Sequence, residues 1–175
     1  MHPAGSPEAF DLLVSTGRGL ERKCISALEE VVCSFDPDFR ATTSQFSGLL
    51  EGFATKANRE IVHHIRWILE DKPWYNELIK RAVPIDKVVL TEAGRIVEAV
   101  KDLRLQIPPR DEESFRVRVR KRGAPLDRME LIAAVADLFN NKVDLAHPDF
   151  EVRIEMVGEL SGVSIIRRGE IFPDL

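Results

Sequence analysis

The chain has 175 residues, of which 44% are hydrophobic and 31% charged, with a formal net charge of −4 and two cysteines. This length can bury one large core or two small ones, and the composition is that of an ordinary globular protein. No stretch approaches the roughly 20 apolar residues of a membrane span, no export signal is evident, and two cysteines do not make a disulfide framework, so a cytoplasmic protein without a membrane partner is expected.

The first half of the chain alternates between short apolar strands and amphipathic helices. A loose tail is predicted over residues 1–9, which include two prolines and a glycine. The elements that follow are a strand over Phe10–Thr16, a helix with Leu20, Cys24, Leu28 and Val31 on its inner face, a short strand near Phe39–Thr42, a strand over Ser47–Phe53, and a helix capped by Asn58 and stopped before Pro73. This β-α-β-α order predicts a small α+β unit.

The second half continues the alternation. Its predicted elements are an extended segment over Arg81–Leu90, a helix from Thr91, a basic strand within Phe115–Arg122, a helix capped by Asp127 and Glu130, a strand over Phe150–Met156, and a last strand over Gly162–Ile166. We therefore expect an α+β chain of two units, residues 1–72 and residues 73–168, joined near residues 72–80.

The segment Phe115–Arg122, with the sequence FRVRVRKR, contains five positive charges and no negative one. Without these charges the rest of the chain would carry −9 instead of −4, so positive charge is concentrated in one strip. Because side chains alternate along a strand, one face is expected to pack inward and the other to carry guanidinium groups about 6.6 Å apart, which suit phosphate oxygens. The inward residues would be Phe115, Val117 and Val119, and the basic row Arg116, Arg118 and Arg120, extended into the following turn by Lys121 and Arg122.

The residues alone support a second interpretation of these arginines about equally well. They could pair across strands with Glu151 and Glu155 and merely solubilise one face of a sheet. Two features favour ligand binding: Lys121 and Arg122 exceed what two glutamates neutralise, and Arg153 stands between those glutamates. The basic strip is therefore predicted to contact an anionic partner.

Two motifs flank the predicted helix that is capped by Asp127 and Glu130. Phe115, Val117 and Arg122 fit a strand of the form F-x-V-x-x-x-x-R, and Val143, Asp144, Leu145, Pro148 and Asp149 fit a V-D-L-x-x-P-D run after the helix. This arrangement resembles the THUMP domain of RNA-modification proteins. The resemblance covers roughly residues 60–168, including an entry strand at Arg81–Ile85, and implies a THUMP α/β domain that binds RNA.

The first half carries a second, less specific likeness. Its strand, Gly17-x-Gly19-Leu20-Glu21 turn and helix resemble the ferredoxin-like domain that precedes THUMP in tRNA-modifying proteins. With both parts present, the chain is most similar to the Tan-type family. That resemblance implies a non-catalytic protein that binds tRNA and assists a separate acetyltransferase that makes N4-acetylcytidine.

The other polar candidates carry less chemistry. The turn between the first strand and helix places Arg18 where it is expected to add a peripheral phosphate contact. His63 and His64 point about 100° apart on a helix, which does not suit a shared metal. The chain also lacks a G-x-S-x-G elbow, a zinc-deaminase signature and a Gly-rich nucleotide loop, so no catalytic residue, metal site or cofactor is predicted.

Two groups of apolar side chains receive structural roles. Trp67, Trp74 and Tyr75 are expected to close the seam between the two units. Val143 and Leu145 are expected to anchor their loop in the core.

Two functions remain open from the sequence. In the first, the chain is an RNA-binding adaptor whose basic strip grips tRNA for a partner enzyme. In the second, it is a protein-interaction module whose basic face binds an acidic protein, which the net charge of −4 and the small size allow.

Overall fold

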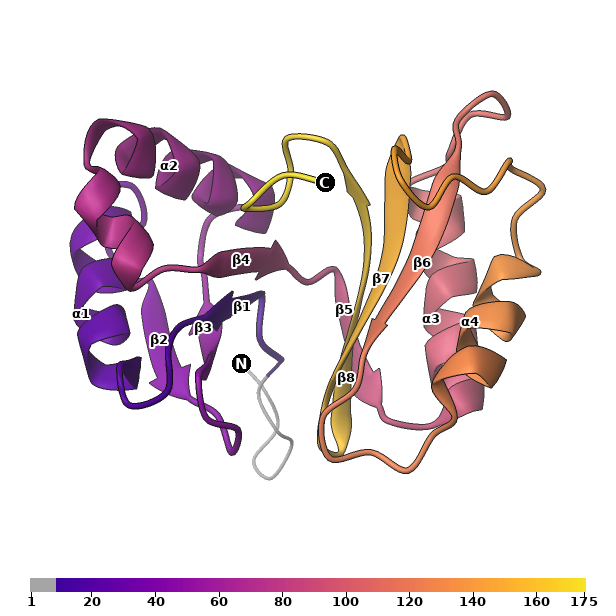
Figure 1. Cartoon of the computed structure of the whole chain (residues 1–175), viewed down its shortest axis with the longest axis horizontal. Coiled ribbons are helices and arrows are strands. Elements are labelled where there is room, and N and C mark those ends of the chain that lie inside the picture. The colour runs from indigo at the N-terminus through magenta and orange to yellow at the C-terminus, as the bar shows by residue number, and fades with distance from the viewer. Residues whose placement is uncertain (1–8) are drawn as a thin grey trace.

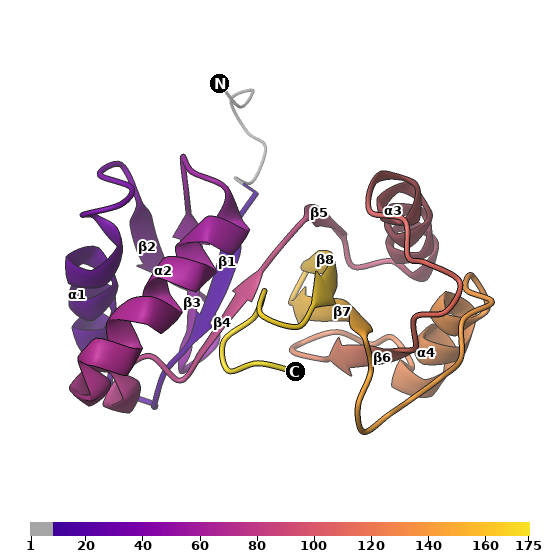
Figure 2. The ribbon, with the colours of Figure 1, turned by 90° about the horizontal axis from the view of Figure 1, so that it is seen from above.

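The computed structural model describes residues 9–175, so all but the last residue of the tail predicted over residues 1–9 lies outside the described part. Two four-stranded sheets are each covered on one face by two helices (Figures 1 and 2). The α+β class expected from the sequence is confirmed. Within residues 9–175 no helix has the length and apolarity needed to cross a membrane.

The first unit is a ferredoxin-like β-α-β-β-α-β arrangement. It consists of β1 (Leu12–Ser15), α1 (Glu21–Val32), β2 (Arg40–Thr43), β3 (Leu49–Phe53), α2 (Asn58–Asp71), a 3-10 helix (Pro73–Glu77) and β4 (Arg81–Pro84). Its strands are all antiparallel and lie in the order β2-β3-β1-β4. Because β4 pairs with β1, the first sheet takes up half of the extended segment predicted over Arg81–Leu90 and reaches beyond residue 72.

The second unit begins with the other half of that segment. It consists of β5 (Lys87–Leu90), α3 (Ala93–Gln106), β6 (Phe115–Arg120), α4 (Arg128–Ala136), β7 (Phe150–Val157) and β8 (Leu160–Arg167). The sheet order is β5-β8-β7-β6, with β6 parallel to β7 and the other pairs antiparallel. Asp127 caps α4 by accepting the Glu130 N–H at 2.8 Å, as predicted. The core between sheet and helices includes Phe115, whose ring centroid lies 5.4 Å from that of Phe150.

Two helix starts differ from those predicted. The side-chain amide of Asn58 does not cap α2 but donates to the carbonyl oxygens of Asp11, at 3.2 Å, and Ile85, at 2.8 Å. The hydroxyl of Thr91 lies 2.8 Å from that of Ser161 on β8, and α3 begins two residues later. Both side chains make contacts to distant segments of the chain, and local sequence spacing does not reveal such partners.

The two units pack against each other along a hydrophobic seam. The first unit contributes Phe10, Leu13, Leu49, Val83 and Ile85, and the second unit together with the C-terminal segment contributes Val157, Ile166 and Ile171. After β8 the chain returns to β4, where the backbones of Ala82 and Phe172 exchange hydrogen bonds of 2.8 and 3.0 Å. The first sheet is therefore covered on both faces, by its helices on one side and by the seam on the other.

The aromatic side chains predicted to close this seam do not reach it. Trp67 and Trp74 are each 62% exposed, and Tyr75 packs on the core of the first unit, where its hydroxyl donates to Glu30 at 2.6 Å. The prediction was wrong because α2 and the 3-10 helix lie on the outer face of the first sheet. The seam instead uses the aliphatic side chains on the inner face of that sheet.

Arg59 on α2 ties the two units together. Its guanidinium donates to Asp86 at 2.9 Å, to Glu170 at 3.1 Å and to the carbonyl oxygen of Ile165 at 2.7 Å. Asp86 also accepts the Ile165 N–H at 3.1 Å. One guanidinium group thus joins α2 to the connection between the sheets, to β8 and to the segment after β8.

We expect Arg59→Ala to lower the free energy of unfolding by about 2–3 kcal/mol, because it leaves the partly buried carboxylate of Asp86 without its ion-pair partner. The partial exposure of the pair keeps this loss below that of a fully buried ion pair. Lys87→Ala is the matched control. It removes an exposed ion pair with Asp102, and exposed pairs contribute about 1 kcal/mol or less. Urea denaturation of both variants tests this, and equal losses would contradict the role assigned to Arg59.

Candidate nucleic-acid interface

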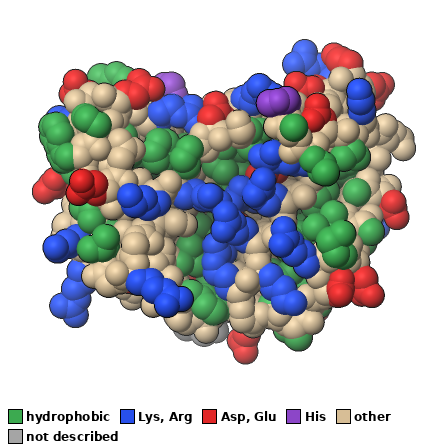
Figure 3. Space-filling view, in the orientation of Figure 1, with side chains coloured by type: hydrophobic (Ala, Val, Ile, Leu, Met, Phe, Trp, Pro, Cys, Tyr) green, Lys and Arg blue, Asp and Glu red, His purple; other side chains and the backbone are tan. Residues whose placement is uncertain are grey.

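The side chains of β6 alternate between the two faces of the second sheet, as predicted. Phe115 and Val119 are buried under α3 and α4, and Val117 packs against the same core. The intervening arginines lie on the opposite face, which is turned toward the first unit. Figure 3 shows Lys and Arg side chains gathered over the middle of the molecule, between the two units.

Five arginines and two glutamates of this face and one arginine of the first unit lie together, and we call them the arginine cluster. Its members are Arg81 on β4, Arg116, Arg118 and Arg120 on β6, Arg122 just after β6, and Glu151, Arg153 and Glu155 on β7. The parallel register sets Arg116 opposite Glu151, Arg118 opposite Arg153, and Arg120 opposite Glu155. Charges of both signs are therefore interleaved across two neighbouring strands.

The two glutamates are buried in the middle of the cluster. Glu151, which is 0% exposed, accepts hydrogen bonds from Arg116 at 2.7 Å, Arg118 at 3.2 Å and Arg153 at 3.0 Å. Glu155 accepts from Arg122 and from Arg153, each at 2.7 Å. The cross-strand pairing considered from the sequence therefore exists. Arg122, which was expected to be in excess, is one of the paired residues because the turn after β6 brings it back over Glu155.

These contacts govern the ionisation of Glu151. Burial by itself raises the pKa of this carboxyl, but the charge of Arg153 and the hydrogen bonds from Arg116 and Arg153 hold the pKa below its usual range. The opposite balance applies to Arg153, where burial lowers the pKa and the two glutamates raise it above its ordinary value. Both side chains are therefore charged at neutral pH.

The pairing leaves a surplus of positive charge. Six guanidinium groups share two carboxylates, and the side chains of Arg81 and Arg120 have no ion-pair partner among residues 9–175. Burial and the repulsion of neighbouring arginines lower the pKa of both, although Glu155 acts in the opposite direction. The cluster thus carries more positive charge than its two carboxylates neutralise.

The predicted basic residues differ in exposure, and Arg120 is half-buried. Arg116 and Arg122 are mostly covered, at 15% and 21% side-chain exposure, whereas Arg118 remains 39% exposed. Lys121 is exposed just beyond the end of β6. Arg18 is exposed at the turn between β1 and α1, and no contact in the described part of the chain links its side chain to the cluster.

Sequence reasoning missed one member of the cluster. Arg81 lies on the other sheet, in a segment that the sequence shows only as extended, and nothing local marks it as a partner of β6. The sequence did indicate the place of Arg153, because it lies two residues from Glu151 and two from Glu155 and so shares their strand face.

The loop that carries the V-D-L-x-x-P-D motif is not anchored as expected. Val143 is 54% and Leu145 73% exposed, so the prediction that they enter the core was wrong. Hydrogen bonds hold the loop instead: the Asp144 N–H donates to the Phe115 carbonyl oxygen, and Asp149 accepts the Ser114 N–H, each at 2.9 Å. These polar contacts tie the loop to the start of β6, which leaves its apolar side chains at the surface.

The remaining reactive residues do not gather into a site. No group of three His, Cys, Asp or Glu side chains that could hold a metal occurs in the described part of the chain. His64 packs between Phe35 and Trp67, while His63 is exposed. Both cysteines are free, and burial raises the pKa of the Cys24 thiol to about 11, which leaves it protonated at neutral pH.

Comparison with known proteins identifies the second unit. Residues 91–166 match the family model of the THUMP domain, so the chain contains a THUMP domain, as its motifs implied. This stretch begins directly after β5 and ends within β8. No curated protein sequence matches the chain.

Solved structures share the fold of both units. TrmN from Thermus thermophilus matches with a TM-score of 0.63 and 21% identity, over 90% of this chain and 45% of its own. PH1313 from Pyrococcus horikoshii Ot3 matches with a TM-score of 0.62 and 16% identity, over 91% and 55%. A predicted N6-adenine-specific DNA methylase from Listeria monocytogenes matches with a TM-score of 0.55 and 11% identity, over 90% and 40%. The chain thus spans about half the length of these structures.

Proposed function

We propose that this chain, whose residues 91–166 form a THUMP domain, binds tRNA through the arginine cluster. The observation that carries the proposal is the surplus of guanidinium groups on the face between the two units. A polyanion with regularly spaced phosphates would balance that surplus, and RNA-modification proteins are the class in which the THUMP domain occurs.

The ion pairs within the cluster support binding because they orient the arginines without using all their donors. A guanidinium group has five N–H donors. Arg118 gives only its Nε–H to Glu151, and Arg122 gives only an Nη1–H to Glu155. The remaining N–H groups of these side chains are left for phosphate oxygens, which accept two parallel hydrogen bonds from one guanidinium. The buried glutamates thus serve as a scaffold that fixes the direction of the donors.

The adaptor role extends this proposal to a partner. The chain would be a non-catalytic cytoplasmic protein that presents tRNA to a separate modification enzyme, an acetyltransferase that makes N4-acetylcytidine. Support comes from the resemblance of its two-part organisation to the Tan-type family. A purified acetyltransferase should form more N4-acetylcytidine when this chain is added, and an unchanged yield would count against the adaptor role.

The salt dependence of tRNA binding tests the RNA-binding proposal directly. If about five phosphates are neutralised, the logarithm of the association constant should fall against the logarithm of salt concentration with a slope near −3.5 to −4.5. Electrophoretic mobility shifts at a series of potassium chloride concentrations give that slope. Binding that does not change with salt would contradict the proposal.

The alternative role in protein binding predicts a different pattern. Partner proteins would then remain bound to the chain after nuclease treatment of a cell extract, while purified tRNA would not bind. In the RNA-binding role, nuclease would release the partners that are held through RNA. Co-purification with and without nuclease therefore separates the two.

A further inference from the structure

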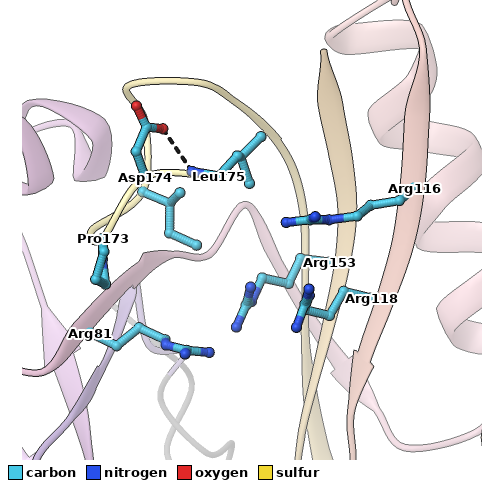
Figure 4. Close-up of a pocket in the computed structure, with 8 residues that line it drawn as sticks. Arg81, Arg116, Arg118, Arg153, Pro173, Asp174 and Leu175 are labelled. Atoms are coloured by element: carbon cyan, nitrogen blue, oxygen red, sulfur yellow. Dashed lines mark hydrogen bonds between the residues drawn. The ribbon is translucent and has the colours of Figure 1, made fainter. Parts of the chain in front are cut away.

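A small cavity lies at the junction of the two units, on the arginine cluster. Four arginines line it: Arg81 from the first sheet and Arg116, Arg118 and Arg153 from the second. The C-terminal segment, residues 171–175, forms its remaining wall, and the cavity volume is about 170 Å³. Figure 4 shows the guanidinium groups of Arg81, Arg118 and Arg153 pointing toward one another across this space.

The cavity has more positive than negative charge around it. The carboxylate of Glu151 is the common partner of Arg116, Arg118 and Arg153, and Arg153 also pairs with Glu155, so the four arginines of the cavity face two carboxylates. The acidic side chain in the wall, Asp174, is occupied elsewhere, because its Oδ1 accepts the N–H groups of Gly169 at 2.7 Å and Leu175 at 2.9 Å. It is directed away from the arginines (Figure 4).

One donor at this cavity is buried and has no partner. The side chain of Arg153 is 4% exposed, and its Nε and Nη1 groups bind Glu155 and Glu151. Its Nη2 group is buried without any hydrogen bond in the part of the chain that the structure describes. Buried donors almost always have partners because an unmade hydrogen bond is costly, so this group points to a ligand that accepts its hydrogen bonds.

We propose that this cavity is a binding site for a single phosphate group, built jointly by the two units. Guanidinium forks match the oxygens of a tetrahedral oxyanion. Several guanidinium groups around one small space offer more hydrogen-bond donors than a single carboxylate can accept. The volume also fits a phosphate group with a few waters, since pockets for drug-sized ligands occupy roughly 300–1,000 Å³. The phosphate can come from an RNA backbone, from an RNA terminus or from free inorganic phosphate.

The inference deepens the proposed function and rests on it, because it assigns one phosphate of the bound RNA to a defined position. It also gives Arg81 a role that the other members of the cluster cannot fill. Arg81 is the only one of the four arginines from the first sheet, so the site is complete only while the two units are packed together. Phosphate binding should consequently stabilise the packed arrangement.

The first test uses inorganic phosphate and the full chain. Phosphate should raise the melting temperature above that in potassium chloride of equal ionic strength, and isothermal titration should show one site. Arg81→Gln should weaken phosphate affinity about tenfold, the loss expected for one phosphate contact. Arg95→Gln, which removes an exposed charge on α3, should leave the affinity unchanged. Equal melting in the two salts, or equal affinities of Arg81→Gln and the unaltered chain, would overturn the proposal.

Arg81 is suited to this test because its side chain makes no ion pair that the fold depends on among residues 9–175. If Arg81→Gln nevertheless fails to fold, Arg81→Lys provides the same comparison. It retains the positive charge and removes the fork, so an affinity below that of the unaltered chain is expected. An affinity equal to that of the unaltered chain would contradict a bidentate contact.

The second test identifies the source of the phosphate with an RNA hairpin that carries either a 5′-phosphate or a 5′-hydroxyl. Tighter binding of the phosphorylated hairpin, lost in Arg81→Gln, assigns the site to a terminal phosphate. Equal binding of both hairpins, weakened alike in Arg81→Gln, assigns it to the backbone. If Arg81→Gln leaves RNA affinity unchanged while other cluster variants lower it, the pocket assignment falls and the proposed function stands. If no RNA binds, the proposed function falls, and with it the assignment of an RNA phosphate.

Discussion

Replacing both Arg118 and Arg120 by alanine is expected to weaken tRNA binding about 100-fold at low salt and to make the log–log salt slope shallower by about two. Among the arginines of the cluster that pair with a glutamate, Arg118 is the most exposed and therefore the most accessible to a ligand. Arg120 has no ion-pair partner in the described part of the chain. Each would lose one charge-assisted phosphate contact, worth about 1.5 kcal/mol. All tRNAs should be weakened alike, because phosphate contacts do not read sequence.

A double variant elsewhere on the molecule is the control for this experiment. Arg95→Ala with Arg128→Ala removes the same net charge from α3 and α4, which cover the opposite face of the second sheet. Its affinity and salt slope should stay close to those of the unaltered chain. If the two double variants lose affinity equally, bulk charge and not the arginine cluster accounts for binding.

Glu151→Gln is expected to cause the largest loss of stability, about 3–5 kcal/mol, or roughly 10 °C in melting temperature. The buried carboxylate pairs with three arginines, and the substitution leaves Arg153 buried with one carboxylate instead of two. Glu98→Gln, at an exposed position on α3, should cost less than about 1 kcal/mol. Urea denaturation at pH 7 measures both, and similar losses in the two variants would rule out a structural role for the cluster.

The effect of Glu151→Gln should also depend on pH. The folded-state pKa of Glu151 lies below the ordinary glutamate value of about 4.3, so its ionised form stabilises the fold fully above that value. This stabilisation is lost as the pH falls through the folded-state pKa. The difference in unfolding free energy between the variant and the unaltered chain should therefore be full at pH 7 and shrink as the pH falls below about 4. A difference that stays constant down to pH 3 would contradict this.

Glu151 and Arg118 show which features of the candidate site the sequence could predict. The alternation of FRVRVRKR and FEVRIEM predicts which side chains share a face, and the structure confirms it. Spacing could not show which face is solvated, since that depends on what packs over the sheet. The arginines thus lie in a partly covered junction between two units, and not on an open surface.

The loop after α4 illustrates a second limit. The V-D-L-x-x-P-D motif located the THUMP domain correctly, and the family match over residues 91–166 agrees with it. The same motif misled about burial, because Val143 and Leu145 are apolar yet exposed. A motif records which residues accompany a fold, but hydrogen bonds to β6 decide where this loop lies.

The amino-acid sequence by itself determined the element order, the α+β class, the THUMP motif and the concentration of charge in one strand. These features follow from local periodicity and composition, which act over a few residues. Only the tertiary structure decided that β4 joins the first sheet, that aliphatic side chains form the seam, and that Arg81 faces Arg118 and Arg153. These contacts join residues that are far apart in the chain, and their energies depend on burial and on neighbouring charges that exist only once the two units have packed.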